Sequence, residues 1–206
     1  MSTLKRLLAW AVDRGEIATN RAEKIGRLHT ADRSESVWTD EDFAAFRLHA
    51  SKELQWAIDL AAHTGLRQGD LIALAWTNYD GQSFQVRTSK RGKVALIPAT
   101  AECRALMGRI AKRQAVILTT ERGKRPWTAD GLRSSFRKAC LLAKVNRTFH
   151  DLRRTAATRL VANGIPSGQI AMMMGWSEVD IEALKRKYVS RSAVVKTMLA
   201  NMGEDA

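Results

Sequence analysis

The chain has 206 residues, of which 45% are hydrophobic, and its 34 Lys and Arg residues against 21 Asp and Glu residues give a net charge of +13. This length suits one compact domain with a shorter appendage, and the hydrophobic fraction is too high for a disordered chain. No apolar run approaches the ~18 residues that span a bilayer, and Cys103 and Cys140 lack the spacing of metal ligands, so the composition predicts a soluble cytoplasmic protein with free thiols, no metal and no membrane partner.

The N-terminal region predicts one short helix followed by a linker. Apolar residues recur at helical spacing from Leu4 to Val12, and Gly15 ends the pattern. From residue 17 to residue 36 the chain is mostly polar, which is typical of a linker. We therefore interpret residues 1–36 as the end of a larger helical region that leads into a main domain starting near Val37.

The main domain is predicted to be mainly helical. Thr39 is followed by three acidic residues, a combination that caps free N–H groups and opposes the positive end of the helix dipole. Further helices are expected over residues 53–64, 68–75, 101–113, 129–143, 151–163, 167–174, 181–187 and 193–202.

A small sheet is expected between the helices. Apolar and polar residues alternate over 84–88 and again over 94–98, which predicts an antiparallel hairpin with Lys90 and Arg91 at its tip. Residues 116–118 are a candidate third strand. The predicted fold class is thus α+β, mainly α with a small antiparallel β-sheet.

The positive charge is concentrated in one quarter of the chain. Residues 101–150 carry 12 basic and 3 acidic side chains, which accounts for +9 of the net +13. Such a local excess predicts a face that binds a polyanion, and nucleic acid is the commonest one available to a cytosolic protein. Arg133, Arg137 and Lys138, on the helix expected over 129–143, are candidates for phosphate contacts.

Three short motifs contain residue types that bind phosphate. His150 and Arg153 are three residues apart, so a helix would project both from one face, where a guanidinium fork and an imidazole can meet one phosphate. Arg67 follows a helix-ending glycine in the sequence Thr-Gly-Leu-Arg. The third motif, Met-Gly-Trp-Ser around Trp176, is followed about a dozen residues later by Tyr188.

Together these motifs resemble the tyrosine recombinases, the phage integrase family, over roughly Val37 to Met202. The shared pattern is an Arg in a Thr-Gly-Leu-Arg turn, a Lys on a hairpin, His-x-x-Arg, a Gly-His/Trp-Ser turn and then a Tyr, and every part occurs here in order. Most family members have His at the position of Trp176, so the resemblance is to the members that use Trp there. It implies an integrase catalytic-domain fold for residues 37–206 and makes residues 1–36 the C-terminal remnant of an N-terminal core-binding helical domain plus linker.

The resemblance implies roles for the principal catalytic residues. Tyr188 is expected to attack a DNA phosphodiester and to form a 3′-phosphotyrosyl link. Arg67 and Arg153 are expected to hold the non-bridging phosphate oxygens, and the indole N–H of Trp176 to donate to one of them. No metal or other cofactor is implied.

The remaining site residues are expected to move protons or hold DNA. Lys90 matches the general acid that protonates the leaving 5′ oxygen, although its neighbours Arg91 and Lys93 are alternatives for that role. His150 matches a proton acceptor or phosphate hydrogen-bond partner, and Asp70 matches an acidic position expected to orient the arginines. The residues expected to bind DNA are Arg91, Lys93, Arg133, Arg137, Lys138 and Arg154.

The expected function is site-specific recombination or integration of DNA by a cytoplasmic, nucleoid-associated protein of a bacterial or phage mobile element. The resemblance implies double-stranded DNA as substrate and a homotetramer on two DNA sites at synapsis. The helix expected over 193–202 is a candidate for docking on a neighbouring protomer or for packing on its own core. Two alternatives remain open: a type IB topoisomerase-like enzyme that relaxes supercoils, and a truncated integrase remnant that binds DNA without full recombination activity.

Overall fold

A computed structural model describes residues 3–26, 37–87, 89, 92, 94–122 and 124–188 of the chain, with Lys187 and Tyr188 described as backbone alone. The chain divides into two compact units, Met1–Arg33 and Ser34–Ala206. Each unit is described by itself below.

The first unit is a helix with a short segment folded back on it. Helix α1 spans Thr3–Asp13, close to the predicted range. Asn20 donates from Nδ2 to the carbonyl oxygen of Lys5 at 3.1 Å, and the Lys5 ammonium donates to the carbonyl oxygen of Glu23 at 2.9 Å. Ala22 is buried by this arrangement. Part of the predicted linker, residues 20–23, is therefore held against the helix.

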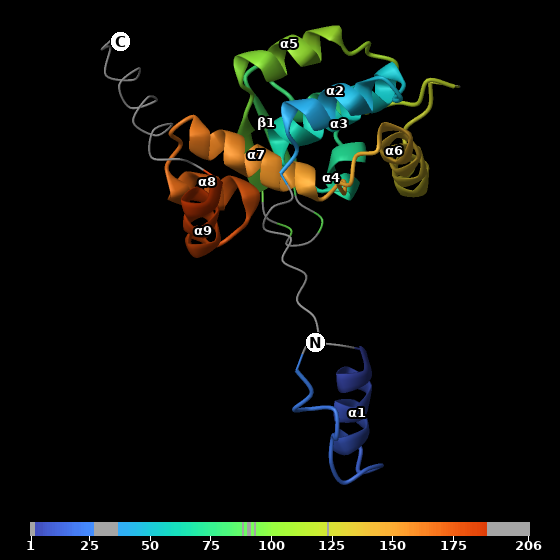
Figure 1. Ribbon diagram of the computed structural model, residues 1–206, viewed down its shortest axis with the longest axis vertical. Coiled ribbons are helices and arrows are strands. Elements are labelled where there is room, and N and C mark those ends of the chain that lie inside the picture. Colours follow the sequence, from blue (N-terminus) through green and yellow to red (C-terminus); the bar gives the residue numbers. More distant parts are fainter. Residues whose placement is uncertain are drawn as a thin grey trace. The chain divides into compact units, whose positions relative to one another are not determined.

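The second unit is mainly helical with a two-stranded antiparallel sheet, which confirms the predicted fold class (Figure 1). Its strands, β1 (Ser83–Arg87) and β2 (Val94–Pro98), pair in a register from Ser83 opposite Pro98 to Arg87 opposite Val94. The helices are α2 (Asp40–Arg47), α3 (Lys52–Thr64), α4 (Gln68–Ile72), the 3₁₀ turn η1 (Trp76–Asn78), α5 (Ala101–Arg109), α6 (Ala129–Ala143), α7 (Asp151–Ala162), α8 (Ser167–Met174) and α9 (Glu178–Tyr188).

Several of the expected elements differ from the structure. Helix α4 ends at Ile72 rather than at residue 75, and α9 starts at Glu178 rather than at residue 181. Residues 116–118 do not form a third strand, because Val116 makes only an isolated bridge to Ala75 and the chain turns into η1 directly after Ala75. Helix α5 ends at Arg109 rather than at residue 113, since Ile110 leaves the helix with extended backbone. The helix expected over 193–202 lies outside the described residues.

Side-chain caps begin several helices, and the cap at Thr39 is the one that the sequence predicts. At α2, the Thr39 hydroxyl accepts from the Asp42 N–H at 3.2 Å, and the Asp42 carboxylate accepts from the Thr39 N–H at 3.1 Å. Each such cap stabilises a protein by about 1 kcal/mol. The same kind of hydroxyl cap is formed by Ser51, Thr100 and Thr128.

Helix α7 joins two hydrophobic clusters. Leu152, in its first turn, belongs to the larger cluster, which includes Trp38, Phe46 and Phe136. From Ala156 onward its buried residues belong to a smaller cluster shared with α8 and α9. Figure 1 accordingly shows α7 (orange) running from α4 toward α8 and α9. Residues near the start of α7 therefore lie where the clusters meet.

No helix in the described part of the chain is long and apolar enough to cross a membrane. Cys103 and Cys140 are buried free thiols, as predicted, and burial raises their pKa values to about 11 and about 12. Among the described residues, no group of three His, Cys, Asp or Glu side chains is placed to hold a metal ion.

Candidate functional site

A tight turn between α3 and α4 presents Arg67. Gly65 ends α3 with a φ of +62°, and a Cβ at this position would lie 2.5 Å from Cε of Met174 and 3.2 Å from Cβ of Ala156. The backbone conformation thus favours glycine, and a Cβ here would also displace the end of the Met174 side chain. Arg67 then begins α4 with extended backbone. Its guanidinium makes no hydrogen bond or ion pair to any side chain or backbone group that the structure describes, so its donors are free to bind a ligand.

Arg153 is held by main-chain carbonyl oxygens. Its side chain is buried in the first turn of α7, where Nη1 donates to the carbonyl oxygen of Gly65 and Nη2 to that of Met174. A guanidinium has five N–H donors. Of the three that these bonds leave, the Nε–H is buried without a partner among the described residues, so one N–H on each Nη is left for a ligand. Burial, together with the charge of Arg67, lowers the pKa of Arg153 to about 10, and the charge of Asp70 opposes this effect.

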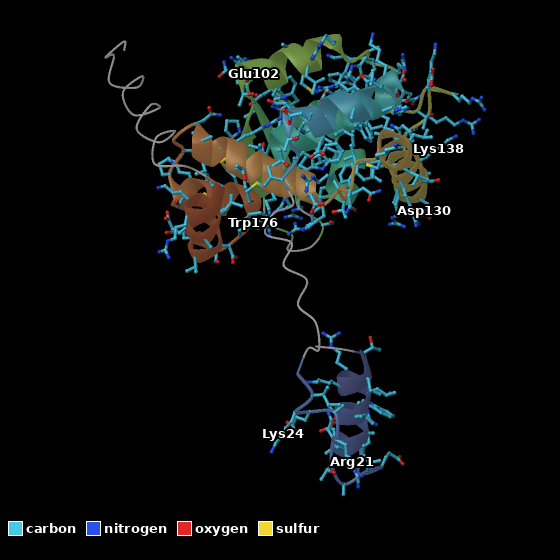
Figure 2. All side chains as sticks on the ribbon, viewed as in Figure 1. Arg21, Lys24, Glu102, Asp130, Lys138 and Trp176 are labelled. Atoms are coloured by element: carbon cyan, nitrogen blue, oxygen red, sulfur yellow. The ribbon has the colours of Figure 1, made fainter. Side chains whose placement is uncertain are left out.

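Trp176 completes a cavity that both arginines line. The sharp turn after α8 is made by Gly175, with a φ of +59°, and it leads into Trp176, which is labelled in Figure 2. The centre of the Trp176 ring lies 5.7 Å from the Arg153 guanidinium carbon. The cavity has a volume of about 450 Å³ and is lined by Arg67, Arg153 and Trp176 together with parts of β2, α8 and α9. The structure therefore brings together three of the predicted catalytic residues.

His150 lies one turn before Arg153. It is the residue before α7, and its carbonyl oxygen accepts from the Arg153 N–H at 3.1 Å. Burial lowers the pKa of His150, and the charges of Arg153, Arg67 and Arg154 lower it further, against the opposing charge of Asp151. The imidazole thus lies in the electrostatic field of both site arginines and favours its neutral form, which can accept a proton.

Asp70 is buried, and its hydrogen bond goes to the sheet hairpin. Oδ1 accepts from the backbone N–H of Ser89 at 2.9 Å, whereas Oδ2 has no partner among the described residues. Its relation to Arg153 is electrostatic, through the opposing effect on the Arg153 pKa. The carboxylate therefore holds the base of the hairpin loop that contains Lys90.

Several predicted site residues lie outside the described part of the chain. Lys90, Arg91 and Lys93 belong to the hairpin loop between β1 and β2, and the structure describes only Ser89 and Gly92 there. Tyr188 is the last residue of α9, and its side chain is not among those described. The proposed roles of these four residues stay predictions.

The predicted DNA-binding residues of α6 lie together on an exposed surface. Arg133, Arg137 and Lys138 line a shallow hollow of about 430 Å³ with Asp130, which pairs with Arg133 at 2.8 Å (Figure 2). Gln68, the residue after Arg67, donates to the carbonyl oxygen of Ala129 at the start of this helix over 2.7 Å. The basic face of α6 is thereby joined to the Arg67 turn. Arg154 lies on α7 beside the site residue Arg153.

Sequence reasoning missed the main-chain groups that build the site. The carbonyl oxygens of Gly65 and Met174 hold Arg153, and the Ser89 N–H holds Asp70. Because a backbone group is common to every residue type, the sequence contains no direct signal for such partners. The glycines that end α3 and α8 were the available indirect signal, since both carbonyls lie at those helix ends.

The comparisons with known proteins agree with this geometry. The model of the phage integrase family matches residues 42–192 of the chain. The chain belongs to the phage integrase family. The resemblance inferred from the motifs is thus confirmed.

Individual relatives and structures show how far the likeness extends. A XerC-like tyrosine recombinase from Caldanaerobacter subterraneus subsp. tengcongensis is 24% identical over 87% of this chain, which spans 59% of that relative. The structure of a lambda integrase (75–356) dimer bound to a COC′ core site has a TM-score of 0.74 and 22% identity, covering 92% of this chain and 72% of that one. A lambda integrase tetramer bound to a Holliday junction has a TM-score of 0.69 and 22% identity, covering 85% of this chain and 56% of that one. These structures share the fold.

Proposed function

We propose that residues 37–206 are the catalytic domain of a tyrosine-type site-specific DNA recombinase, an enzyme that cleaves and rejoins DNA strands without a metal ion. The observation that carries this proposal is the cavity lined by Arg67, Arg153 and Trp176. Two guanidinium groups face it, while Glu178 is the one carboxylate among its lining residues. A phosphodiester, whose negative charge is shared by two non-bridging oxygens, is the group that such a donor set fits best.

In the proposed reaction, Tyr188 supplies the nucleophile. Its phenol oxygen bonds to the phosphorus, the bond from phosphorus to the 5′ oxygen breaks, and a 3′-phosphotyrosyl link remains. His150 accepts the phenol proton, and Lys90 gives a proton to the departing 5′ oxygen. In the second step, the 5′ hydroxyl of a partner strand attacks the phosphotyrosine, which rejoins the DNA and frees Tyr188.

The two arginines stabilise the charge that develops on the phosphoryl oxygens. Arg153 is preorganised because neutral carbonyl oxygens fix its guanidinium without neutralising it. Arg67 adds donors that have no partner among the described residues, and the Trp176 indole N–H adds another. Fixed donors of this kind need no reorganisation at the moment of reaction, and each is worth about 3 kcal/mol of barrier.

Asp70 supports the loop that contains Lys90, the proposed general acid for the leaving group. By binding the Ser89 N–H, its carboxylate fixes the start of the loop that contains Lys90. Its negative charge also opposes the lowering of the Arg153 pKa by burial and by Arg67. We infer that Asp70 supports both the general acid and the phosphate-binding arginine.

Double-stranded DNA is the proposed substrate, held beyond the cavity by basic side chains on several elements. Helix α6 supplies three of them and starts beside the Arg67 turn. The remaining proposed contacts come from Arg154 and from the loop residues Arg91 and Lys93. The lambda integrase tetramer on a Holliday junction supports a tetramer on two DNA sites as the working assembly.

Residues 1–36 are proposed to be the end of a core-binding helical domain plus the linker to the catalytic domain. The division of the chain at Arg33 and Ser34 supports this boundary. We expect the protein to act on bacterial or phage DNA in the nucleoid of the cytoplasm.

The proposal is tested with nicked suicide duplexes, chosen by selecting bound sequences from a random library and analysed on denaturing gels. We expect a covalent protein–DNA band that forms in EDTA and is lost in Tyr188→Phe. Tyr79→Phe is the matched control, because the Tyr79 hydroxyl only donates to the carbonyl oxygen of Gly81 and its ring stacks on Phe84. No adduct on any selected duplex, or an adduct that persists in Tyr188→Phe, would overturn the proposal.

The same preparation separates the alternatives. Relaxation of a supercoiled plasmid that lacks the selected sequence would indicate a type IB topoisomerase-like enzyme. Tight binding without an adduct would indicate a DNA-binding remnant.

A further inference from the structure

The residues that lead into His150 are held from the beginning of the second unit. Arg147 donates from Nε to Oδ2 of Asp42 at 2.8 Å, and the Trp38 indole N–H donates to the carbonyl oxygen of Thr148 at 3.4 Å. These contacts join residues 105 and 110 positions apart in the sequence. The path of the chain into His150 is therefore fixed against the start of α2 as well as by α7 itself.

The cap of α2 orients the Asp42 carboxylate that Arg147 binds. The same Oδ2 accepts from the Thr39 N–H at 3.1 Å as part of the α2 cap. The side chains of Asp42 and Arg147 are 18% and 26% exposed, so water competes only partly for the bond. A shielded charge pair of this kind restricts geometry more than a fully exposed pair does.

Further contacts tie the same segment to α7. The Trp38 N–H donates to the Thr155 hydroxyl at 2.9 Å, and that hydroxyl donates to the carbonyl oxygen of Asp151 at 3.1 Å. The Asp151 carboxylate in turn accepts from the Thr148 N–H at 2.6 Å. The Phe149 ring packs edge-on against Phe136, with centroids 5.6 Å apart. Each residue from 147 to 149 is thus held by at least one contact, while the His150 side chain makes no capping hydrogen bond.

We propose that Asp42 and Arg147 form a positioning pair that orients His150, an inference that rests on the proposed function of His150 as proton acceptor. The pair does not touch the reacting atoms. It acts through residues 147–149, which set the direction from which the imidazole faces the site. Without the pair, Arg147 loses its bond to Asp42, the segment has one constraint fewer, and His150 spends less time oriented for proton transfer.

The catalytic test compares Asp42→Asn, Arg147→Gln and the double variant in single-turnover cleavage of the suicide duplex. We expect each single variant to be about tenfold slower and the double variant to be no slower than the slower single variant, because the second change removes a bond that is already broken. The Asp42→Asn change keeps an oxygen for the α2 cap. Unfolding midpoints and gel-shift affinities are measured alongside and are expected to match the wild type closely.

Asp42→Asn also separates positioning from DNA contact. If Arg147 acted by binding a phosphate, Arg147→Gln would weaken DNA binding and Asp42→Asn would leave the cleavage rate unchanged, and that result would overturn the proposal. The matched control pair is Arg47 with Asp59, which form an ion pair of 2.7 Å on α2 and α3. Arg47→Gln and Asp59→Asn are expected to cleave at the wild-type rate, and an equal loss in these variants would contradict a role specific to His150.

A readout without DNA keeps this inference separate from the proposed function. The imidazole resonances of His150, assigned by their loss in His150→Gln, are followed by NMR from pH 5 to 8. The charged groups that face the imidazole are Asp151, Arg153 and Arg154 on α7 and Arg67 from the α3–α4 turn, and none of them is altered. We expect displaced resonances in both pair variants and wild-type resonances in Arg47→Gln.

The two readouts fail independently. Wild-type His150 resonances in Asp42→Asn and Arg147→Gln would overturn the positioning pair even if cleavage is observed. Displaced resonances in a protein that forms no adduct on any duplex would support the positioning pair while the proposed function fails.

Discussion

Two cavities of similar volume are lined by α7 and contain the same kinds of basic side chain, yet only one of them has the character of a phosphate site. The proposed active-site cavity, about 450 Å³, contains Arg67 and Arg153, with His150 nearby. The second cavity, about 380 Å³, lies between α3, α5 and α7 and contains three arginines and a histidine: Arg47, Arg109, Arg159 and His63. Figure 2 labels Trp176 at the first and Glu102 at the second.

The difference lies in what the arginines already bind. In the second cavity Arg47 pairs with Asp59 at 2.7 Å, Arg159 lies 5.1 Å over the Phe43 ring, and Glu102 adds another carboxylate. In the first cavity Arg153 binds neutral carbonyl oxygens and Arg67 binds none of the described groups. The number of basic residues therefore does not identify an anion site, because an arginine already paired with a carboxylate has fewer donors left for a ligand.

The largest expected effect comes from Arg153→Ala, which alters catalysis and folding together. The change removes phosphate donors and leaves the carbonyl oxygens of Gly65 and Met174 buried without their partner. We expect the cleavage rate to fall at least about 1000-fold and the free energy of unfolding to fall by about 3 kcal/mol. Single-turnover cleavage and urea denaturation measure the two losses. Unchanged stability would show that the carbonyl bonds contribute nothing to the fold.

Arg67→Ala is expected to separate catalysis from stability. Because the Arg67 guanidinium has no partner among the described groups, we expect a stability change within about 0.5 kcal/mol but a rate loss of about 100-fold or more. Arg47→Ala in the second cavity is the matched control and should cleave at the wild-type rate. Comparable rate losses in both variants would contradict the claim that only the first cavity binds the reacting phosphate.

The elements of the fold were largely predictable because their signals are local. Helix α8 occupies the predicted residues, and the hydroxyl caps that begin α2 and α6 were readable as single residues. Helix α9 starts three residues before its predicted start at residue 181. The sequence also contained a local signal for this earlier start, a capping box at Ser177 and Asp180. The Ser177 hydroxyl accepts from the Asp180 N–H at 3.2 Å, and the Asp180 carboxylate accepts from the Ser177 N–H at 3.3 Å, which is a capping box.

The grouping of three candidate residues was predictable, but the contacts that hold them were not. The order of the motifs indicated that Arg67, Arg153 and Trp176 act together, and they do line one cavity. What the sequence lacked was the burial of Arg153 and the choice of its acceptors, which lie 88 and 21 residues away and are backbone groups. The Asp42–Arg147 pair was hidden for a similar reason: surface charges are common, and only the fold selects which of them meet.

A smaller effect is expected from the basic face of α6. Replacing Arg133, Arg137 and Lys138 together by Gln should weaken DNA binding similarly on all sequences and lower the slope of log affinity against log salt by about 0.9 for each phosphate that the protein no longer neutralises. Fluorescence anisotropy at several salt concentrations measures the slope. As a control, Arg109→Gln on α5 removes a basic side chain of the second cavity and should leave the salt slope unaltered. An unchanged slope in the triple variant would show that these three α6 side chains do not contact DNA phosphates.

The smallest expected effect concerns the histidines, one beside each cavity. Burial lowers the pKa of His63, and the charge of Arg159 lowers it further, just as burial and Arg153 lower the pKa of His150. Below the ordinary pKa of about 6.5 the unfolded chain takes up protons that the folded chain refuses, so these histidines make stability fall as the pH drops from 7 toward 5. His63→Gln and His150→Gln should each flatten that fall in urea denaturation at pH 7 and pH 5, and the double variant should flatten it further. Only His150→Gln should also slow cleavage, since His63 lines the second cavity and not the proposed active-site cavity. A wild-type pH dependence in His63→Gln would show that its pKa is the same in the folded and unfolded chain.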